Sequence, residues 1–322
     1  MAGMMTMAKK EFTDIVGEKK FLLIFATLLI VTCVSAYQGG LQYAESQSTS
    51  GTITITSGGG RGGMNMMMGS AESLSRSLSS MIENFSLVGG ILAIAISFDT
   101  INNERQKGSL KTLLSYPIYR DSIVYGKYLG GLFVIIMVTT ITFLGSMGLF
   151  ISVTNIALTT DTITRLAVFF GITIVYMAIF LAIGLLLSIV LPSPSTSLLA
   201  SVIAWLASIQ LIPNVGYAIG QILYPVKMAV SSTGMPSFTQ QTGFTTIRAI
   251  ISAVSPSTSY ESIINSVLTS SSLEFTSGAV TEKSIVVADA LMTVLPNILY
   301  FVGLMIGIFA AAYVIFMRQE IR

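Results

Sequence analysis

The chain has 322 residues, of which 52% are hydrophobic and 10% are charged, and its mean hydropathy is +0.79. Soluble domains carry about 25% charged residues, so this composition excludes a soluble globular protein and indicates an integral membrane protein. The chain has no histidine, one cysteine (Cys33) and a net charge of +2. These counts exclude imidazole catalysis, histidine-ligated metals and a cysteine cluster, and no basic stretch is dense enough to bind nucleic acid.

The first 20 residues carry an amphipathic pattern. Phe12, Ile15 and Val16 fall on one helical face, and charged residues occupy much of the remainder. A helix of this kind lies along a membrane surface, with its lysines near anionic lipid headgroups. We therefore predict that residues 1–20 form a cytoplasmic interfacial helix in contact with membrane lipid. A solvated charged tail is the alternative interpretation.

Six apolar stretches follow, each near the length of about 20 residues that a helix needs to cross the hydrocarbon core. The predicted fold is an all-α polytopic integral membrane protein with six transmembrane helices in a single domain, residues 21–322. Proline should end two of the helices, at Pro192-Ser193-Pro194 after the fourth span and at Pro213 after the fifth. The predicted spans are residues 21–37, 82–98, 123–153, 166–191, 197–212 and 285–317.

The first span has an alternative interpretation as a secretory signal peptide, because Val34-Ser35-Ala36 resembles a small-residue cleavage site. The segment before it is longer than a usual n-region and contains Glu11, Asp14 and Glu18. These features favour a span that is retained.

The distribution of lysine and arginine predicts the orientation. With six spans, both termini share one side with the loops after spans two and four, and that side holds 11 of the 17 basic residues although the opposite loops are far longer. Basic residues concentrate on the cytoplasmic side of membrane proteins. We therefore predict a multi-pass protein of the cell membrane with both termini in the cytoplasm.

Two segments are external in this topology, residues 38–81 and 214–284. The first is rich in Ser, Thr, Gly and Met, a composition that buries little surface. In the second, Thr258-Ser-Tyr-Glu261 has the pattern of a capping box that opens a helix through about Leu268, so we predict a partly helical insertion before the last span. Met64 and Met66 to Met68 could bind Cu(I) through thioethers. Because no histidine or cysteine accompanies them, we expect no metal site.

The most distinctive segment is the predicted cytoplasmic loop, residues 99–122. Glu104 and Arg105 make the connection polar, Gly108 allows a sharp reversal, and Ser109 can cap a short helix. Pro117 should end that helix. An amphipathic helix outside the bilayer suits the docking of a cytoplasmic partner, and a plain connection between spans is the alternative. The apolar side of the predicted helix carries Leu110, Leu113 and Leu114.

The segment from Phe98 to Lys127 resembles the cytoplasmic loop of ABC-2-type ABC transporter permeases. Its most specific part is Glu104-Arg105-x-x-Gly108-Ser109-Leu110 followed by Ser115-Tyr116-Pro117. The opening Lys10-Glu11-Phe12, the six spans and the insertion before the last span are similar to that family too. The resemblance implies the membrane permease subunit of an ABC exporter. Its partners would be a second permease chain, as a homodimer, and two copies of a separate ABC ATPase.

By the same resemblance, the loop couples this chain to the ATPase. Glu104 and Arg105 would hold the base of the loop, Gly108 and Ser109 would shape its turn, Pro117 would end the helix, and the three leucines would enter a groove of the ATPase. The sequence contains no Gly-x-x-x-x-Gly-Lys-Ser/Thr motif, which cradles phosphates in many ATPases. We therefore expect ATP and Mg on the partner, with no cofactor and no enzymatic activity in this chain.

Two other functions are consistent with the composition, an ion-coupled secondary transporter and a membrane scaffold that transports nothing. Secondary transporters usually show inverted repeats and broken helices at the membrane midplane, and the spans show no obvious repeat. No residue pattern identifies a substrate.

Overall fold

The structure is a computed structural model. Six helices of its described part are long and apolar enough to cross a membrane, which confirms the predicted all-α polytopic membrane fold. These helices cover Lys19–Ala44, Ser77–Gln106, Asp121–Thr154, Thr160–Val190, Pro194–Leu223 and Val287–Arg318. The described residues are 2–49, 73–106, 120–154, 159–225, 227–230, 236–239, 242–269, 271–276, 279–284 and 286–318.

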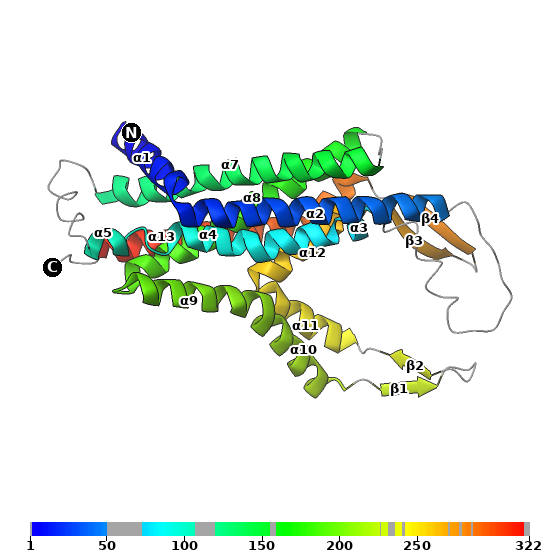
Figure 1. Ribbon diagram of the computed structural model, residues 1–322. Helices are drawn as coiled ribbons and strands as arrows, with labels where there is room; N and C mark the ends of the chain where they lie inside the picture. The colour runs from blue at the N-terminus through cyan, green and yellow to red at the C-terminus, as the bar shows by residue number, and fades with distance from the viewer. Residues whose placement is uncertain are drawn as a thin grey trace.

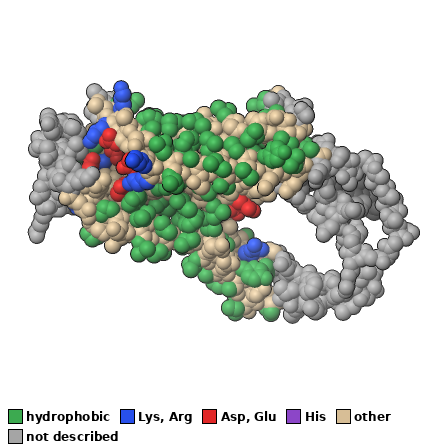
Figure 2. All heavy atoms as spheres, viewed as in Figure 1, with side chains coloured by type: hydrophobic (Ala, Val, Ile, Leu, Met, Phe, Trp, Pro, Cys, Tyr) green, Lys and Arg blue, Asp and Glu red, His purple; other side chains and the backbone are tan. Residues whose placement is uncertain are grey.

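The long helices run side by side along one axis (Figure 1). Helix α1 (Ala2–Gly17) and the last turns of α13 (Val287–Arg318) lie at the same end of the bundle, which we call the basal end. Charged side chains gather at this end, and hydrophobic side chains cover the flank beyond it (Figure 2). The other spanning elements are α2 (Lys19–Thr49), α3 (Ser73–Asn84), η1 (Phe85–Gly89), α4 (Gly90–Ser97), α5 (Asn102–Gln106), α7 (Arg120–Thr154), α8 (Thr160–Val190), α9 (Pro194–Leu206), η2 (Ala207–Leu211) and α10 (Ile212–Leu223).

The N-terminal segment is helical, as its amphipathic pattern predicts. Its apolar side packs on protein, because Met7 and Ala8 are buried and α1 contacts α7 along its length. Ile15 joins the core, and Phe12 and Val16 pack against it. The predicted apolar face is therefore covered by α7 and its neighbours.

Helices α2 and α3 continue well beyond the predicted span ends at residues 37 and 82. They remain paired there because Gly39 lets the backbone of α3 come close, and a Cβ at this position would overlap the Ser77 carbonyl oxygen. Gly40 likewise faces Val153 of α7, whose Cβ lies 3.1 Å from the position that a Cβ on Gly40 would take. Contact between neighbouring helices thus extends the helical structure into residues 38–49 and 73–81.

The prediction that Pro213 ends the fifth span is wrong. The helix passes from α9 through the π-helical segment η2 into α10, and Pro213 lies in the first turn of α10. A proline is tolerated at a helix start because the N–H that it lacks would have no partner there. The wider π turn before it provides such a local start inside a continuous span.

The insertion between α10 and α13 contains two helices and two antiparallel hairpins, so it is partly helical as predicted, and the hairpins are an addition to that prediction. The hairpins pair Lys227 with Thr239 and Ser271 with Ser284. Helix α12 ends at Leu268 as predicted, but it is capped by Ser255, whose side chain accepts the Thr258 N–H. The elements are β1 (Lys227–Val230), β2 (Pro236–Thr239), α11 (Thr242–Ala253), α12 (Pro256–Leu268), β3 (Ser271–Thr276) and β4 (Ala279–Ser284).

Helix α12 belongs to the core of the bundle. Tyr260 is fully buried, stacks on Tyr176 of α8 at 4.5 Å between ring centroids, and shares a 3.0 Å hydrogen bond with Thr173. At the C-terminal end of α12, the buried Arg165 of α8 donates to the carbonyl oxygen of Thr269 at 2.9 Å. Arg165 also pairs with Asp161 of α8 at 2.8 Å. The arginine satisfies a carbonyl that helix geometry leaves open, so it fixes α12 against α8.

Candidate functional site

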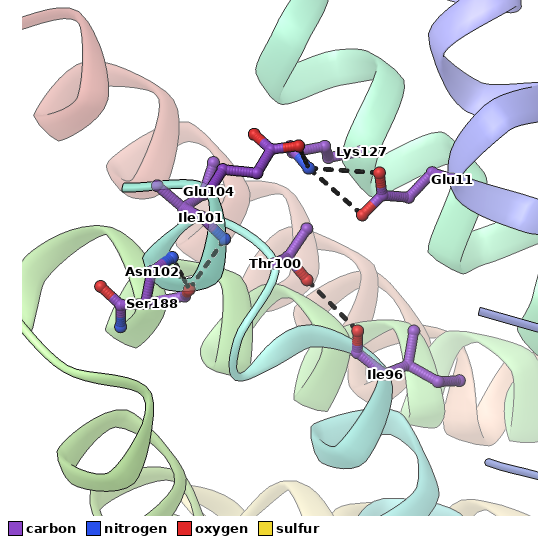
Figure 3. A network of polar contacts seen from close by, with 8 residues as sticks. All are labelled: Glu11, Ile96, Thr100, Ile101, Asn102, Glu104, Lys127 and Ser188. Atoms are coloured by element: carbon purple, nitrogen blue, oxygen red, sulfur yellow. Dashed lines mark hydrogen bonds and ion pairs between the residues drawn. The ribbon is translucent and has the colours of Figure 1, made fainter. Parts of the chain in front are cut away.

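The first turn of the predicted coupling loop is attached to the end of α8. The backbone N–H groups of Ile101 and Asn102 both donate to the hydroxyl oxygen of Ser188, at 3.1 and 3.2 Å (Figure 3). Thr100 turns its hydroxyl back to the carbonyl oxygen of Ile96 at 3.2 Å. The first two bonds satisfy N–H groups at the start of α5, and the third uses a carbonyl near the end of α4, all of which helix geometry leaves open; the bonds to Ser188 place α5 beside α8.

Lys127 of α7 connects this loop base to the N-terminal helix. Its ammonium lies 2.9 Å from Glu104 of α5 and 3.2 Å from Glu11 of α1 (Figure 3). The lysine side chain is 1% exposed, and the two carboxylate side chains are 19% and 12% exposed. Removing one member of a buried ion pair costs about 3–5 kcal/mol because a buried charge is left uncompensated. The basal ion triad, Glu11–Lys127–Glu104, therefore fixes three segments that are distant in sequence.

Two glycines on either side of Lys127 make the triad possible. A Cβ on Gly126 would lie 2.8 Å from the Cβ of Met7, and one on Gly130 would lie 2.7 Å from the Cβ of Glu11. Both distances are too short for real side chains, so α1 can pack on α7 only because these positions are glycine. The close approach brings the Glu11 carboxylate within reach of Lys127.

A second ion pair lies at the start of the loop. Lys20, in the first turn of α2, binds Asp99 at 2.8 Å and Glu18 at 3.1 Å, and its ammonium lies 5.1 Å from the ring centroid of Phe98. The Lys20 side chain is 44% exposed. Exposed pairs of this kind contribute about 0–1 kcal/mol, so this contact orients the loop more than it stabilises the fold.

Arg105 completes the base of the loop. Its guanidinium donates to the carbonyl oxygen of Ile189 at 3.3 Å, near the C-terminal end of α8. A cation at this position also interacts favourably with the helix dipole. Arg105 and Glu104 therefore attach one short helix to two different spans, α8 and α7.

Burial raises the pKa of the Glu11 carboxyl above its usual value, and the neighbouring ammonium of Lys127 opposes this shift. A cavity of about 10 Å³ lies beside Lys127 and Tyr128, room for no more than about one water molecule. This geometry suits a mechanical joint, since the cavity is too small for a ligand.

Two of the eight residues predicted to couple this chain to a partner are in the described part, Glu104 and Arg105, and both lie at the loop base. The remaining six lie outside the described residues: Gly108, Ser109, Leu110, Leu113, Leu114 and Pro117. The methionines considered as copper ligands, Met64 and Met66 to Met68, also lie outside them.

Sequence reasoning did not assign a role to Lys127, Glu11 or Ser188. The first two occur inside segments that resemble the permease family, Gly126-Lys127 and Lys10-Glu11-Phe12. A lysine at the inner end of an apolar span, where an unpaired charge is costly, was the available signal for a buried partner. The sequence gives no sign of which of the 15 acidic residues supplies it.

Comparison with known proteins gives one family. A family model described as "ABC-2 family transporter protein" matches residues 5–321, nearly the whole chain. No curated protein matches the sequence.

Proposed function

The chain belongs to the ABC-2 transporter family and is a membrane permease component of an ABC transporter, and we propose that it works as an exporter whose partner ATPase docks on residues 98–127. ATP and Mg bind to that ATPase, present in two copies, and a second copy of this chain completes the pathway. Both termini, and with them the basal end, face the cytoplasm of the cell membrane.

The basal ion triad is the observation that carries the coupling proposal. A force applied to the loop reaches α7 through Glu104 and Lys127, which are 2.9 Å apart, and reaches α1 through Glu11. It reaches α8 through Arg105 and Ser188. Because these contacts are short and mostly buried, the loop base moves together with the basal ends of three helices. An ATPase that displaces the loop would thereby tilt the spans.

A homodimer is supported by the surface of span five. Only 11% of the most apolar 18-residue stretch of this span is buried within the described chain. A groove of about 620 Å³ runs along the span. Asn214 donates to Gln210 at 3.3 Å in this groove, and such amides are costly to expose to lipid. A second copy covers them. The groove is lined by Ile203, Leu206, Gln210, Leu211, Asn214 and Val215.

The two alternative functions are less well supported. A secondary transporter needs no ATPase partner, whereas the ABC-2 family implies one. A scaffold needs no joint between a cytoplasmic loop and three helices. The triad and its glycine-dependent packing favour a protein that transmits motion.

Copurification with the ABC ATPase tests the docking site. Leu113→Asp places a charge on the apolar side of the predicted loop helix, and we expect the ATPase to be lost while the chain still inserts. Thr112→Asp is the matched control, because 112 falls on the opposite side of a helix with 3.6 residues per turn. Retention of the ATPase and full ATP turnover by Leu113→Asp would show that the loop is a connector only.

Cysteine labelling tests the orientation in a Cys33→Ala background. An impermeant maleimide should label Lys107→Cys only from inside the cell and Thr276→Cys only from outside. Labelling of Thr276→Cys from inside would contradict the six-span topology. For the dimer, Gln210→Cys should form a disulfide between copies under mild oxidation, and a chain that stays monomeric throughout would exclude this face.

A further inference from the structure

Both π-helical segments of the described chain meet the same point of the α11–α12 hairpin. Segment η1 contributes Ser86 and segment η2 contributes Ser208, which are 1% and 3% exposed. Tyr176, near the middle of α8, donates to the Ser86 carbonyl oxygen at 2.7 Å and bonds the Ser257 hydroxyl at 3.2 Å. The turn between α11 and α12 is therefore re-entrant, because it reaches Tyr176 near the middle of α8 and Ser208 near the middle of the fifth span.

Ser208 makes four hydrogen bonds to the first residues of α12 and its cap. Its hydroxyl lies 2.8 Å from the hydroxyl of Ser257 and 3.2 Å from that of Ser255, and it accepts the Ser257 N–H at 3.2 Å. Its carbonyl oxygen also accepts the Ser255 hydroxyl. Ser208 therefore joins η2 to Ser255 and Ser257 through hydrogen bonds of serine hydroxyls and backbone groups.

Helices α10 and α11 form one unit beyond this point. The Cβ of Ile251 lies 3.2 Å from the position of a Cβ on Gly216, and the Phe244 ring lies 2.9 Å from that of a Cβ on Gly220. Tyr217 adds an edge-on contact with Phe244 at 5.7 Å. Figure 1 shows the pair diverging from the bundle, and Figure 2 shows open space between it and the other helices. We call this unit the α10–α11 arm.

The residues on the bundle side of the cluster are fixed. Trp205, in the last turn of α9, packs on Gly90 so closely that a Cβ there would lie 2.7 Å from the indole nitrogen. Tyr260 and Arg165 hold α12 against α8. The arm is therefore joined to fixed structure by two neighbouring segments of chain, η2 on one side and the turn at Val254–Ser255 on the other.

We propose that η2 is a hinge and that the hydrogen bonds of Ser208 to Ser255 and Ser257 hold the arm in its present position. When these bonds break, η2 lifts from the cap of α12 and the arm swings relative to the bundle. A π-helical turn suits a hinge, since its hydrogen bonding differs from that of the helices on either side. Hydroxyl bonds between membrane helices are weak enough to exchange.

This inference rests on the proposed function for its role. The groove proposed to meet a second copy lies on both sides of η2, so a swing of the arm changes the shape of the pathway between two copies. The arm leaves the bundle near its middle and extends away from the basal end, where the loop base lies (Figure 1). It would therefore open the external half of the pathway after the ATPase moves the basal half.

The first test needs no ATPase. Spin labels at Ile163 of α8 and Ile222 of α10, both exposed, report the distance between bundle and arm in nanodiscs, in a Cys33→Ala background diluted with unlabelled chain. We expect Ser208→Ala/Ser257→Ala to broaden the distance distribution or add a second one. A distribution identical to that of the parent would overturn the hinge.

The second test locks the hinge in the assembled complex with its ATPase. Ser208→Cys/Ser257→Cys in the same background should form a disulfide, because the two side-chain oxygens are 2.8 Å apart and disulfide sulfurs lie about 2.05 Å apart. Oxidation should lower ATP turnover at least tenfold, with recovery on reduction. The matched control, Gly216→Cys/Ile251→Cys, joins two helices within the arm and should keep its turnover.

The outcomes separate the two proposals. Wild-type turnover by the oxidised Ser208–Ser257 variant would overturn the hinge. A complex that never assembles with an ABC ATPase would instead contradict the proposed function, and the distance measurement would still decide whether the arm moves.

Discussion

Replacing Lys127 by methionine should destabilise the protein more than any other single loss of charge at the basal end. The ammonium lies 2.9 and 3.2 Å from two carboxylates and its side chain is 1% exposed, so its removal takes from Glu11 and Glu104 the cation that they share. Breaking a buried pair costs about 3–5 kcal/mol. Because both carboxylates keep some contact with solvent, we expect about 3 kcal/mol, a factor of about 150 in the unfolding equilibrium at tenfold per 1.4 kcal/mol.

The cost should disappear when all three charges are removed together. Lys127→Met combined with Glu11→Gln and Glu104→Gln removes all three charges of the triad, and such neutral replacements are often close to neutral in stability. The assay is unfolding in mixed micelles followed by the fluorescence of Trp205, the only tryptophan. Lys20→Met is the matched control, because the exposed Lys20–Asp99 pair should contribute less than about 1 kcal/mol.

The reasoning would be refuted if Lys127→Met unfolded like the parent protein, or if the triple variant were as unstable as the single one. The first result would mean that the triad carries no energy. The second would mean that the cost comes from packing of the lysine stem and not from charge.

Three further predictions concern the packing around the site. Gly130→Leu should displace α1 from α7, seen as faster proteolysis of the N-terminus, whereas Gly148→Leu, with nothing within 4 Å, should not. The stability that Glu11 contributes should be greatest below its ordinary pKa of 4.5 and should decrease as the pH rises through its raised pKa. The reason is that the carboxyl of Glu11 binds its proton more tightly in the folded state than in the unfolded state. Glu11→Gln should lose this dependence in unfolding measured between pH 4.5 and neutral pH. Arg165→Met should cost about 1–3 kcal/mol in the same unfolding assay, since it leaves the carbonyls of Val267 and Thr269 without this donor, and an unchanged midpoint would show that α12 is held by its apolar contacts alone.

Much of the fold could be predicted because hydropathy adds up residue by residue. A stretch such as residues 166–191 is too apolar for water and long enough to span a bilayer, whatever its neighbours are. The same holds for the cap at the start of α12, which depends on local residue types, although the capping residue is Ser255 and the prediction placed it three residues later. The extension of α2 to Thr49 could not be predicted, because it depends on α3 lying beside it.

The candidate site was predictable only in part. Glu104 and Arg105 were identified by their resemblance to a family motif, and the structure places both at the loop base. Lys127 lies 23 residues from Glu104 and 116 from Glu11, so no helical spacing connects the three. Their meeting depends on the close packing that Gly126 and Gly130 allow.

The sequence by itself determined that this chain spans a membrane six times and that its first 20 residues contain an amphipathic helix, because both follow from local composition and period. Only the tertiary structure decided which charges share a partner, that Pro213 continues a span through η2, and that the α11–α12 turn lies among the spans at Ser208 and Tyr176. The physical reason is that burial of a polar group depends on what surrounds it in space. A serine or lysine in an apolar run has the same sequence signal whether it faces lipid, solvent or a partner from another helix.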